Sequence, residues 1–68
     1  MFKIHPIPAS NYLIIEHDKP QVTIQVYNAF GMGVINQTLL GNVLDVSMLP
    51  AGVYILKMEN QTTKFIKQ

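Results

Sequence analysis

The chain has 68 residues, and its composition of 49% hydrophobic and 13% charged residues favours one small packed domain over a disordered segment. Five lysines and no arginine stand against four acids, so the chain lacks the guanidinium fork that reads guanine and grips phosphate, which argues against nucleic-acid binding. It has no cysteine for a disulfide or a thiolate metal site, and no apolar run that approaches the ~18 residues of a membrane span.

The first part of the chain predicts an extended lead-in followed by one strand. Residues 1–8 are extended, because two closely spaced prolines impose polyproline-like backbone and cannot donate to a sheet ladder. After a short turn, residues 12–16 predict a strand whose inward face carries Leu13 and Ile15. Residues 17–20 form a polar turn that ends in proline.

Residues 22–27 carry the clearest half-buried strand pattern in the chain, because apolar and polar side chains alternate along them. Residues 28–31 predict a turn, with asparagine and glycine at positions that tolerate left-handed backbone. Residues 32–40 predict the returning strand, with Val34 on its inward face and Gly33 permitting a bulge. The side chains of residues 22–27 predicted to face inward are Val22, Ile24 and Val26.

The C-terminal part predicts three more strands, of which the second is the core strand. Residues 43–46 form a short strand, and the Pro-Ala-Gly sequence at 50–52 reverses the chain tightly. Residues 53–58 then begin apolar on both faces, as expected of a central strand with neighbours on either side. After a turn, residues 62–67 form the last strand. One face of the core strand carries Tyr54, Leu56 and Met58.

These elements amount to about seven short strands at roughly 8–12-residue spacing, with turn residues between them and no sustained helical period. The pattern predicts an all-β fold, a small antiparallel Ig-like β-sandwich. We expect residues 1–68 to form a single domain.

Four blocks of the sequence, in order, resemble the C-terminal sorting domains of the type IX (Por) secretion system. Residues 6–13, Pro-Ile-Pro-Ala-Ser-Asn-Tyr-Leu, are similar to that family's Pro-Asn-Pro-Ala-Ser opening, with Ile7 in place of the usual asparagine. Residues 26–31 resemble its Val-Tyr-Asn block, which ends in glycine. Residues 44–54 resemble its Asp-Val-Ser, Leu and Gly-Val-Tyr block, and residues 63–67 resemble its basic, apolar end.

The resemblance implies a secretion and sorting signal at the end of a larger secreted protein of Bacteroidota-type bacteria, with no catalysis of its own. Its expected partners are the outer-membrane secretion machinery and a sortase-like protease that removes the domain, and its cargo is an N-terminal part outside this chain. The expected location is the cell surface or the medium, reached through the periplasm and outer membrane. The implied motif residues are Pro6, Pro8, Ala9, Ser10, Tyr27, Asn28, Gly31, Leu49, Gly52 and Tyr54.

The last strand is the candidate recognition edge, formed by Lys64, Phe65, Ile66 and Lys67. Lysines on an edge strand hinder aggregation, and the same edge offers a receptor a place to add a strand of its own. Open edges also permit an edge-strand dimer. Tyr54 is expected to pack in the core with its hydroxyl on a backbone acceptor, at the start of the core strand.

The alternative function is an accessory adhesion or carbohydrate-binding sandwich. Tyr12 and Tyr27 both lie on the side of their strands opposite the inward-facing residues. If the two rings shared one sheet face, they would form a patch for a glycan or a partner. Catalytic, cofactor and metal sites are not predicted. No serine lies in a Gly-x-Ser-x-Gly context, and the histidines are too far apart for a His-x₃₋₅-His zinc pair. The residues considered for such chemistry are His5, Ser10, His17, Asp18, Asp45 and Ser47.

Overall fold

A computed structural model describes residues 3–6 and 8–68, and within them the chain forms strands and turns but no helix, which confirms the all-β prediction. Ile7 and the first two residues of the predicted lead-in lie outside the described residues. The strands are β1 (Lys3–His5), β2 (Tyr12–Glu16), β3 (Val22–Tyr27), β4 (Gly33–Leu39), β5 (Val43–Asp45), β6 (Gly52–Met58) and β7 (Gln61–Lys67).

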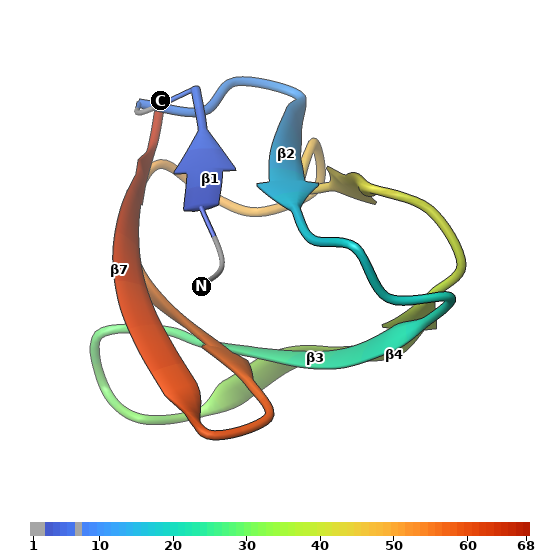
Figure 1. The fold of residues 1–68 in the computed structure, drawn as a ribbon. Helices are drawn as coiled ribbons and strands as arrows, with labels where there is room; N and C mark the ends of the chain where they lie inside the picture. The colour runs from blue at the N-terminus through green and yellow to red at the C-terminus, as the bar shows by residue number, and fades with distance from the viewer. Residues whose placement is uncertain (1–2, 7) are drawn as a thin grey trace.

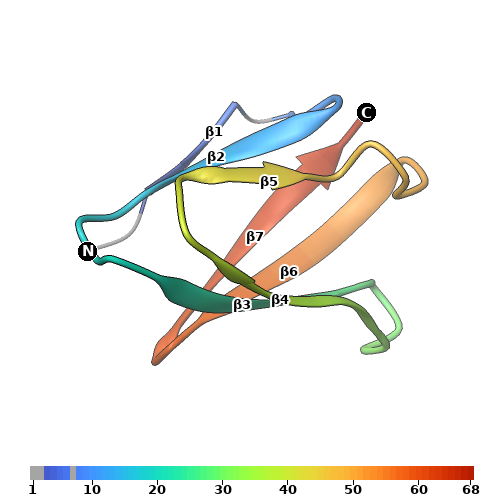
Figure 2. The same cartoon turned by 90° about the vertical axis from the view of Figure 1, so that its right-hand side faces the viewer.

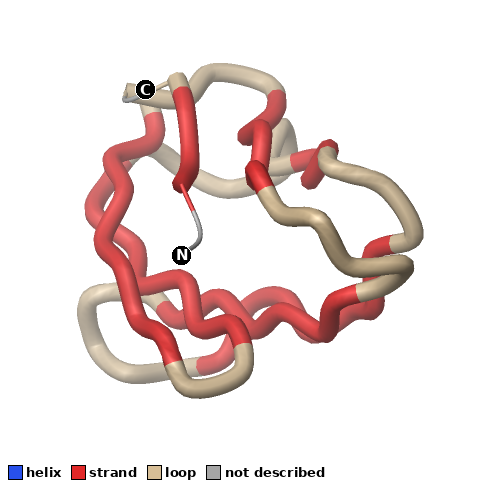
Figure 3. The backbone as a smooth tube through the Cα atoms, in the orientation of Figure 1, coloured by secondary structure: helices blue, strands red, loops and turns tan. Residues whose placement is uncertain are grey.

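Two antiparallel sheets pack face to face, as Figures 1 and 2 show. One sheet has the order β1-β2-β5, and the other has the order β4-β3-β6-β7, with β6 in a central position as the sequence predicts. This arrangement is an Ig-like sandwich in which the fourth strand has joined the sheet of the third. The connecting turns are tan in Figure 3, and Figure 2 shows them at the two ends of the sandwich.

The core fills the space between the sheets with the side chains that the alternation assigns to the inward faces. Leu13 and Ile15 of β2 are fully buried, as are Ile24 and Val26 of β3, because every second residue of a strand points to the same side. On β6 the second layer covers only one face, that of Tyr54, Leu56 and Met58. The opposite face of β6 is left toward solvent.

The face of β4 differs from the prediction. A bulge lies between the pairs Val26–Ile35 and Tyr27–Gly33, so Val34 has no opposite residue on β3. The bulge that Gly33 suggested is therefore confirmed, but Val34 is exposed rather than inward. An extra residue in one strand shifts the alternation by one position, which moves Ile35 and Leu39 to the core side.

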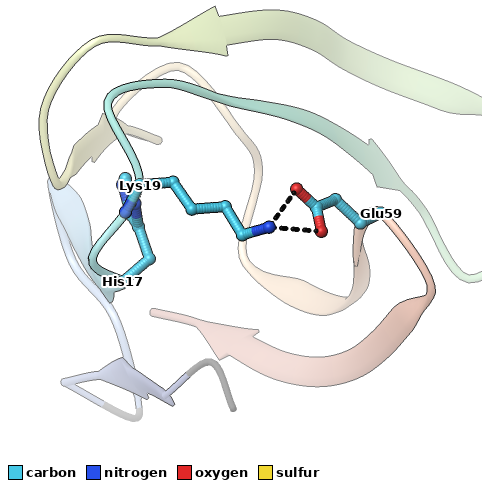
Figure 4. A network of polar contacts seen from close by, with 3 residues as sticks. All are labelled: His17, Lys19 and Glu59. Atoms are coloured by element: carbon cyan, nitrogen blue, oxygen red, sulfur yellow. Dashed lines mark hydrogen bonds and ion pairs between the residues drawn. The ribbon is translucent and has the colours of Figure 1, made fainter.

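One end of the sandwich carries an exposed ion pair between two of its connections, drawn in Figure 4. Lys19, in the connection between β2 and β3, contacts both carboxylate oxygens of Glu59 in the β6–β7 turn, at 3.0 and 3.1 Å. Both side chains are about half exposed, so we expect at most about 1 kcal/mol of stability from the pair.

No helix in the described part of the chain is long and apolar enough to cross a membrane.

Candidate recognition site

The turn into β6 is built around Tyr54, whose hydroxyl donates a hydrogen bond to the carbonyl oxygen of Pro50 at 2.6 Å. This is the tyrosine corner of Ig-like sandwiches, in which a tyrosine near the start of a core strand bonds to the backbone a few residues upstream. The ring stacks on Phe65 of β7, with the centroids 5.5 Å apart. The prediction of a buried tyrosine with a backbone acceptor is therefore confirmed. Two other motif residues support the turn: Leu49 is buried, and Gly52 has a φ of +157°.

The loop between β3 and β4 is held by Asn28. Its side-chain Oδ1 accepts hydrogen bonds from the backbone N–H groups of Phe30 and Met32, at 2.9 and 3.0 Å. Its backbone N–H donates to the carbonyl of Met32, and the N–H of Gly31 donates back to its carbonyl. Gly31 has a φ of +84°, a conformation that glycine adopts without steric cost. The motif residues here therefore set the shape of the loop.

The opening block lies against the end of the chain. Ala9 is fully buried and forms a parallel bridge with Lys67 of β7. The N–H of Ala9 donates to the carbonyl of Ile66, and the N–H of Gln68 donates to the carbonyl of Ala9, both at 2.8 Å. Figure 1 shows the C-terminus beside the segment that joins β1 to β2. The other opening residues, Pro6, Pro8 and Ser10, are exposed.

The four residues of the predicted recognition edge divide between the two faces of β7. Phe65 is buried in the core, and Lys67 is only 8% exposed, with its Nζ donating to the carbonyl of Gln68 at 2.8 Å. Lys64 and Ile66 are exposed on the outer face. β7 is an edge strand of its sheet, but Ala9 occupies the end of that edge at Ile66–Gln68.

Tyr12 and Tyr27 do not share a sheet face, so the condition under which the two rings would form one patch is not met. Tyr12 is 53% exposed on β2, in the three-stranded sheet. Tyr27 is half-buried on β3, in the four-stranded sheet, and its hydroxyl donates to Gln25. The two rings belong to opposite layers because strand alternation gives the side of a residue but not the sheet that its strand joins.

The polar side chains considered for chemistry either have structural partners or are exposed at turns. His5 contacts the carboxylate of Glu16 at 3.0 Å, and the Nε2 of His17 lies 2.9 Å from the carbonyl oxygen of Gly41. Hydrogen bonds from Ser47 hold the pKa of the Asp45 carboxyl below its ordinary value, because they stabilise the charged form. Ser10 is exposed at the turn before β2, and Asp18 is exposed in the β2–β3 connection. In the described ranges, no three histidine or acidic side chains gather as a metal site.

Most motif residues are thus accounted for by the fold. Ala9, Leu49 and Tyr54 are buried, and Asn28 and Gly31 shape a loop. Sequence reasoning missed the pairing of Ala9 with the end of β7, which joins the first block to the last. It also placed Phe65 and Lys67 on a recognition edge, although their alternate spacing gives both side chains the same inward direction.

The model of the secretion system C-terminal sorting domain family matches residues 3–68. The chain is also similar to beta-agarase D of Zobellia galactanivorans, with 32% identity over 66 residues. That match covers 97% of this chain but only 14% of the agarase, so the chain spans a small part of the length of this relative. A family match over this range agrees with the four sequence blocks, and the chain belongs to the secretion system C-terminal sorting domains, the signals that send bacterial proteins through the outer membrane to the cell surface.

Proposed function

We propose that this domain directs an N-terminal cargo across the outer membrane and is then removed by a sortase-like protease. The observation that carries the proposal is the family match over residues 3–68. The fold supports it, because the motif residues build a sandwich whose shape and surface other proteins can recognise. The similarity to a small part of an agarase fits a signal that is joined to a much larger cargo.

Lys64 and Ile66 are the exposed residues of the predicted edge, and we propose that a receptor contacts them first. Phe65 and Lys67 contribute by holding β7 in place. Deleting residues 65–68 would strand the cargo in the periplasm, but it would also remove Phe65 from the core and the hydrogen bonds of Ala9. Such a truncation therefore tests folding and recognition together, and point variants of exposed residues are needed to separate them.

The fate of the domain separates this proposal from the alternative of an adhesion or carbohydrate-binding module. A reporter protein carrying this chain at its C-terminus is expressed in a bacterium with a type IX secretion system, and the surface form is analysed by intact mass. We expect a product that lacks this domain. A surface reporter that retains all 68 residues and binds a glycan would favour the adhesion module instead.

The edge-strand dimer stays a prediction. β4 is an edge strand, and the part of β7 before Ile66 is not covered by Ala9. Sedimentation of the reporter fusion across a range of concentrations checks it: a monomer at all of them would contradict the dimer.

A further inference from the structure

The outer face of the four-stranded sheet carries a small apolar group beside two lysines. We call the side chains of Val53, Ile55, Lys57, Lys64 and Ile66 the lysine face. Val53 lies opposite Ile66 across the β6–β7 pair, and Ile55 lies opposite Lys64. The second layer of the sandwich covers the other side of these strands, so the lysine face is directed toward solvent.

The apolar part of this face is incompletely buried. Val53 is 44% exposed and Ile66 is 46% exposed, although they form a directly opposed pair, and Ile55 is half-buried between its neighbours. Tyr27 lies opposite Ile55 on the other side, which extends the apolar group onto β3. Adjoining apolar side chains of this kind on the outer face of a small domain indicate a contact surface for a partner.

The two lysines lack acidic partners. Ile55 is opposite Lys64, and Lys57 is two residues further along β6, so the two ammonium groups lie on diagonal positions of neighbouring strands. No ion pair or side-chain hydrogen bond is found for either among the described residues. The acids of the chain are placed elsewhere: Glu16 contacts His5, Asp45 binds Ser47, Glu59 binds Lys19, and Asp18 lies in the β2–β3 connection.

On β7, a partner can reach the lysine face more easily than the paired C-terminal end of the strand. Ala9 already uses the carbonyl of Ile66 and the N–H of Gln68, so a partner strand cannot pair there without displacing it. The inner side chains, Phe65 and Lys67, are buried. Of the predicted edge, the two exposed side chains, Lys64 and Ile66, both belong to the lysine face.

We propose that the lysine face docks a protein of the secretion machinery through an apolar patch bordered by Asp or Glu side chains. This inference rests on the proposed sorting function and adds the surface that performs it. Carboxylates beside Lys57 and Lys64 would supply the missing opposite charges, and an apolar surface would cover Val53, Ile55 and Ile66. An acidic border steers the encounter and excludes basic partners.

A protein partner fits this face better than an anionic membrane surface. Membrane-surface binding by charge relies on clusters of about four to eight basic residues, or on an amphipathic helix that buries long apolar side chains. The lysine face offers two lysines and short, mostly β-branched side chains on a sheet. Such a surface has the flatness and mixed character of a protein–protein contact.

The test compares two double variants that lower the net charge equally. Lys57→Gln with Lys64→Gln alters the lysine face, whereas Lys3→Gln with Lys19→Gln alters exposed lysines elsewhere on the molecule. Each is placed in a reporter that carries this chain at its C-terminus, and the ratio of surface to periplasmic reporter is measured in a bacterium with a type IX system. A third variant, Val53→Thr with Ile66→Thr, removes the apolar part and keeps strand-forming residues.

We expect the Lys57/Lys64 and Val53/Ile66 variants to lower the ratio about tenfold or more, and the Lys3/Lys19 variant to leave it within about twofold. Thermal unfolding of each fusion checks that the domain stays folded. Equal export of the wild type and the lysine-face variants would overturn the docking surface while leaving the sorting function intact. Failure of the wild type to reach the surface would instead overturn the sorting function itself.

A second measurement separates the partner classes. The reporter fusion is sedimented with phosphatidylcholine vesicles that contain anionic phosphatidylglycerol. We expect the wild type to remain in solution. Binding that disappears in Lys57→Gln with Lys64→Gln would assign the face to an anionic membrane surface and overturn the protein partner.

Discussion

Tyr54 donates its phenolic hydrogen to the carbonyl oxygen of Pro50, and this 2.6 Å bond closes the corner at which the chain enters its central strand. The ring is buried against Phe65, so the same residue fastens β6 to β7 and to the turn before it. The corner explains why a Leu-Pro-Ala-Gly-Val-Tyr sequence stands in the middle of the sorting motif. It determines the geometry of the sheet that carries the exposed lysines.

Two substitutions of Tyr54 distinguish the stability contributed by its ring from that contributed by its hydroxyl. Tyr54→Ala empties a core position and should cost about 3–5 kcal/mol, which is comparable to the whole stability of a domain this small. Tyr54→Phe keeps the stacked ring and loses one hydrogen bond, so we expect a cost of about 0.5–1.5 kcal/mol. Urea unfolding of both variants measures these differences. An unchanged midpoint for Tyr54→Ala would mean that the ring is exposed to water.

Ala9→Val tests the link between the first and last blocks. Ala9 is fully buried, with both backbone groups bonded to β7, so two extra methyl groups should cost about 1–3 kcal/mol through overpacking. Hydrogen exchange at the Gln68 amide should speed up in the variant, because that amide bonds to Ala9. Ala51→Val, at an exposed position, is the matched control. Slow exchange at Gln68 in Ala9→Val would contradict the bridge.

Two glycines give a direct test of loop conformation. Gly31 has a φ of +84° and Gly41 does not fall in the left-handed range, while a Cβ at either would meet no atom within 4 Å. Gly31→Ala should therefore cost about 1–2 kcal/mol through backbone strain alone. Gly41→Ala should be neutral or slightly stabilising. Equal unfolding midpoints for the two variants would show that Gly31 does not require left-handed backbone.

Stability should fall in acid partly through Asp45. Its hydrogen bonds with Ser47 lower the pKa of the folded state, so the folded chain binds fewer protons than the unfolded chain in mild acid. The resulting stabilisation is present above the ordinary pKa of aspartate and is lost as pH falls through the lower folded value. Unfolding from about pH 6 to 2 should be less pH-dependent in Asp45→Asn than in the wild type.

Asp18→Asn is the control for that comparison, since no hydrogen bond of the Asp18 carboxylate is found in the described part of the chain. An equal change in pH dependence in both variants would show that net charge, rather than the bonds from Ser47, sets the effect.

Much of the fold follows from local patterns. Residues 12–16 and 22–27 form strands with the predicted bounds and inward sets, because alternation over five or six residues leaves one way to bury the apolar side. The Pro-Ala-Gly turn and the burial of Tyr54 follow from the same local chemistry. The strand count and the antiparallel sandwich then follow from the spacing of the turns.

What the sequence did not predict depends on contacts between distant residues. Val34 was assigned inward because the effect of the bulge on register becomes visible only once β4 is paired with β3. The sequence leaves open whether Tyr12 and Tyr27 share a sheet face, and only the pairing of their strands puts them in different sheets. The bridge from Ala9 to Lys67 carries no periodic signal, since a single bridged residue is too short to show one.

The central claim is that residues 3–68 are a transferable sorting signal, and the export of an unrelated reporter tests it most directly. Surface reporter is measured by protease accessibility in intact cells of a bacterium with a type IX system, with and without this chain at the C-terminus. The account predicts surface reporter only when the chain is present and only when the secretion machinery is intact. A reporter that stays in the periplasm with the folded chain attached would contradict it.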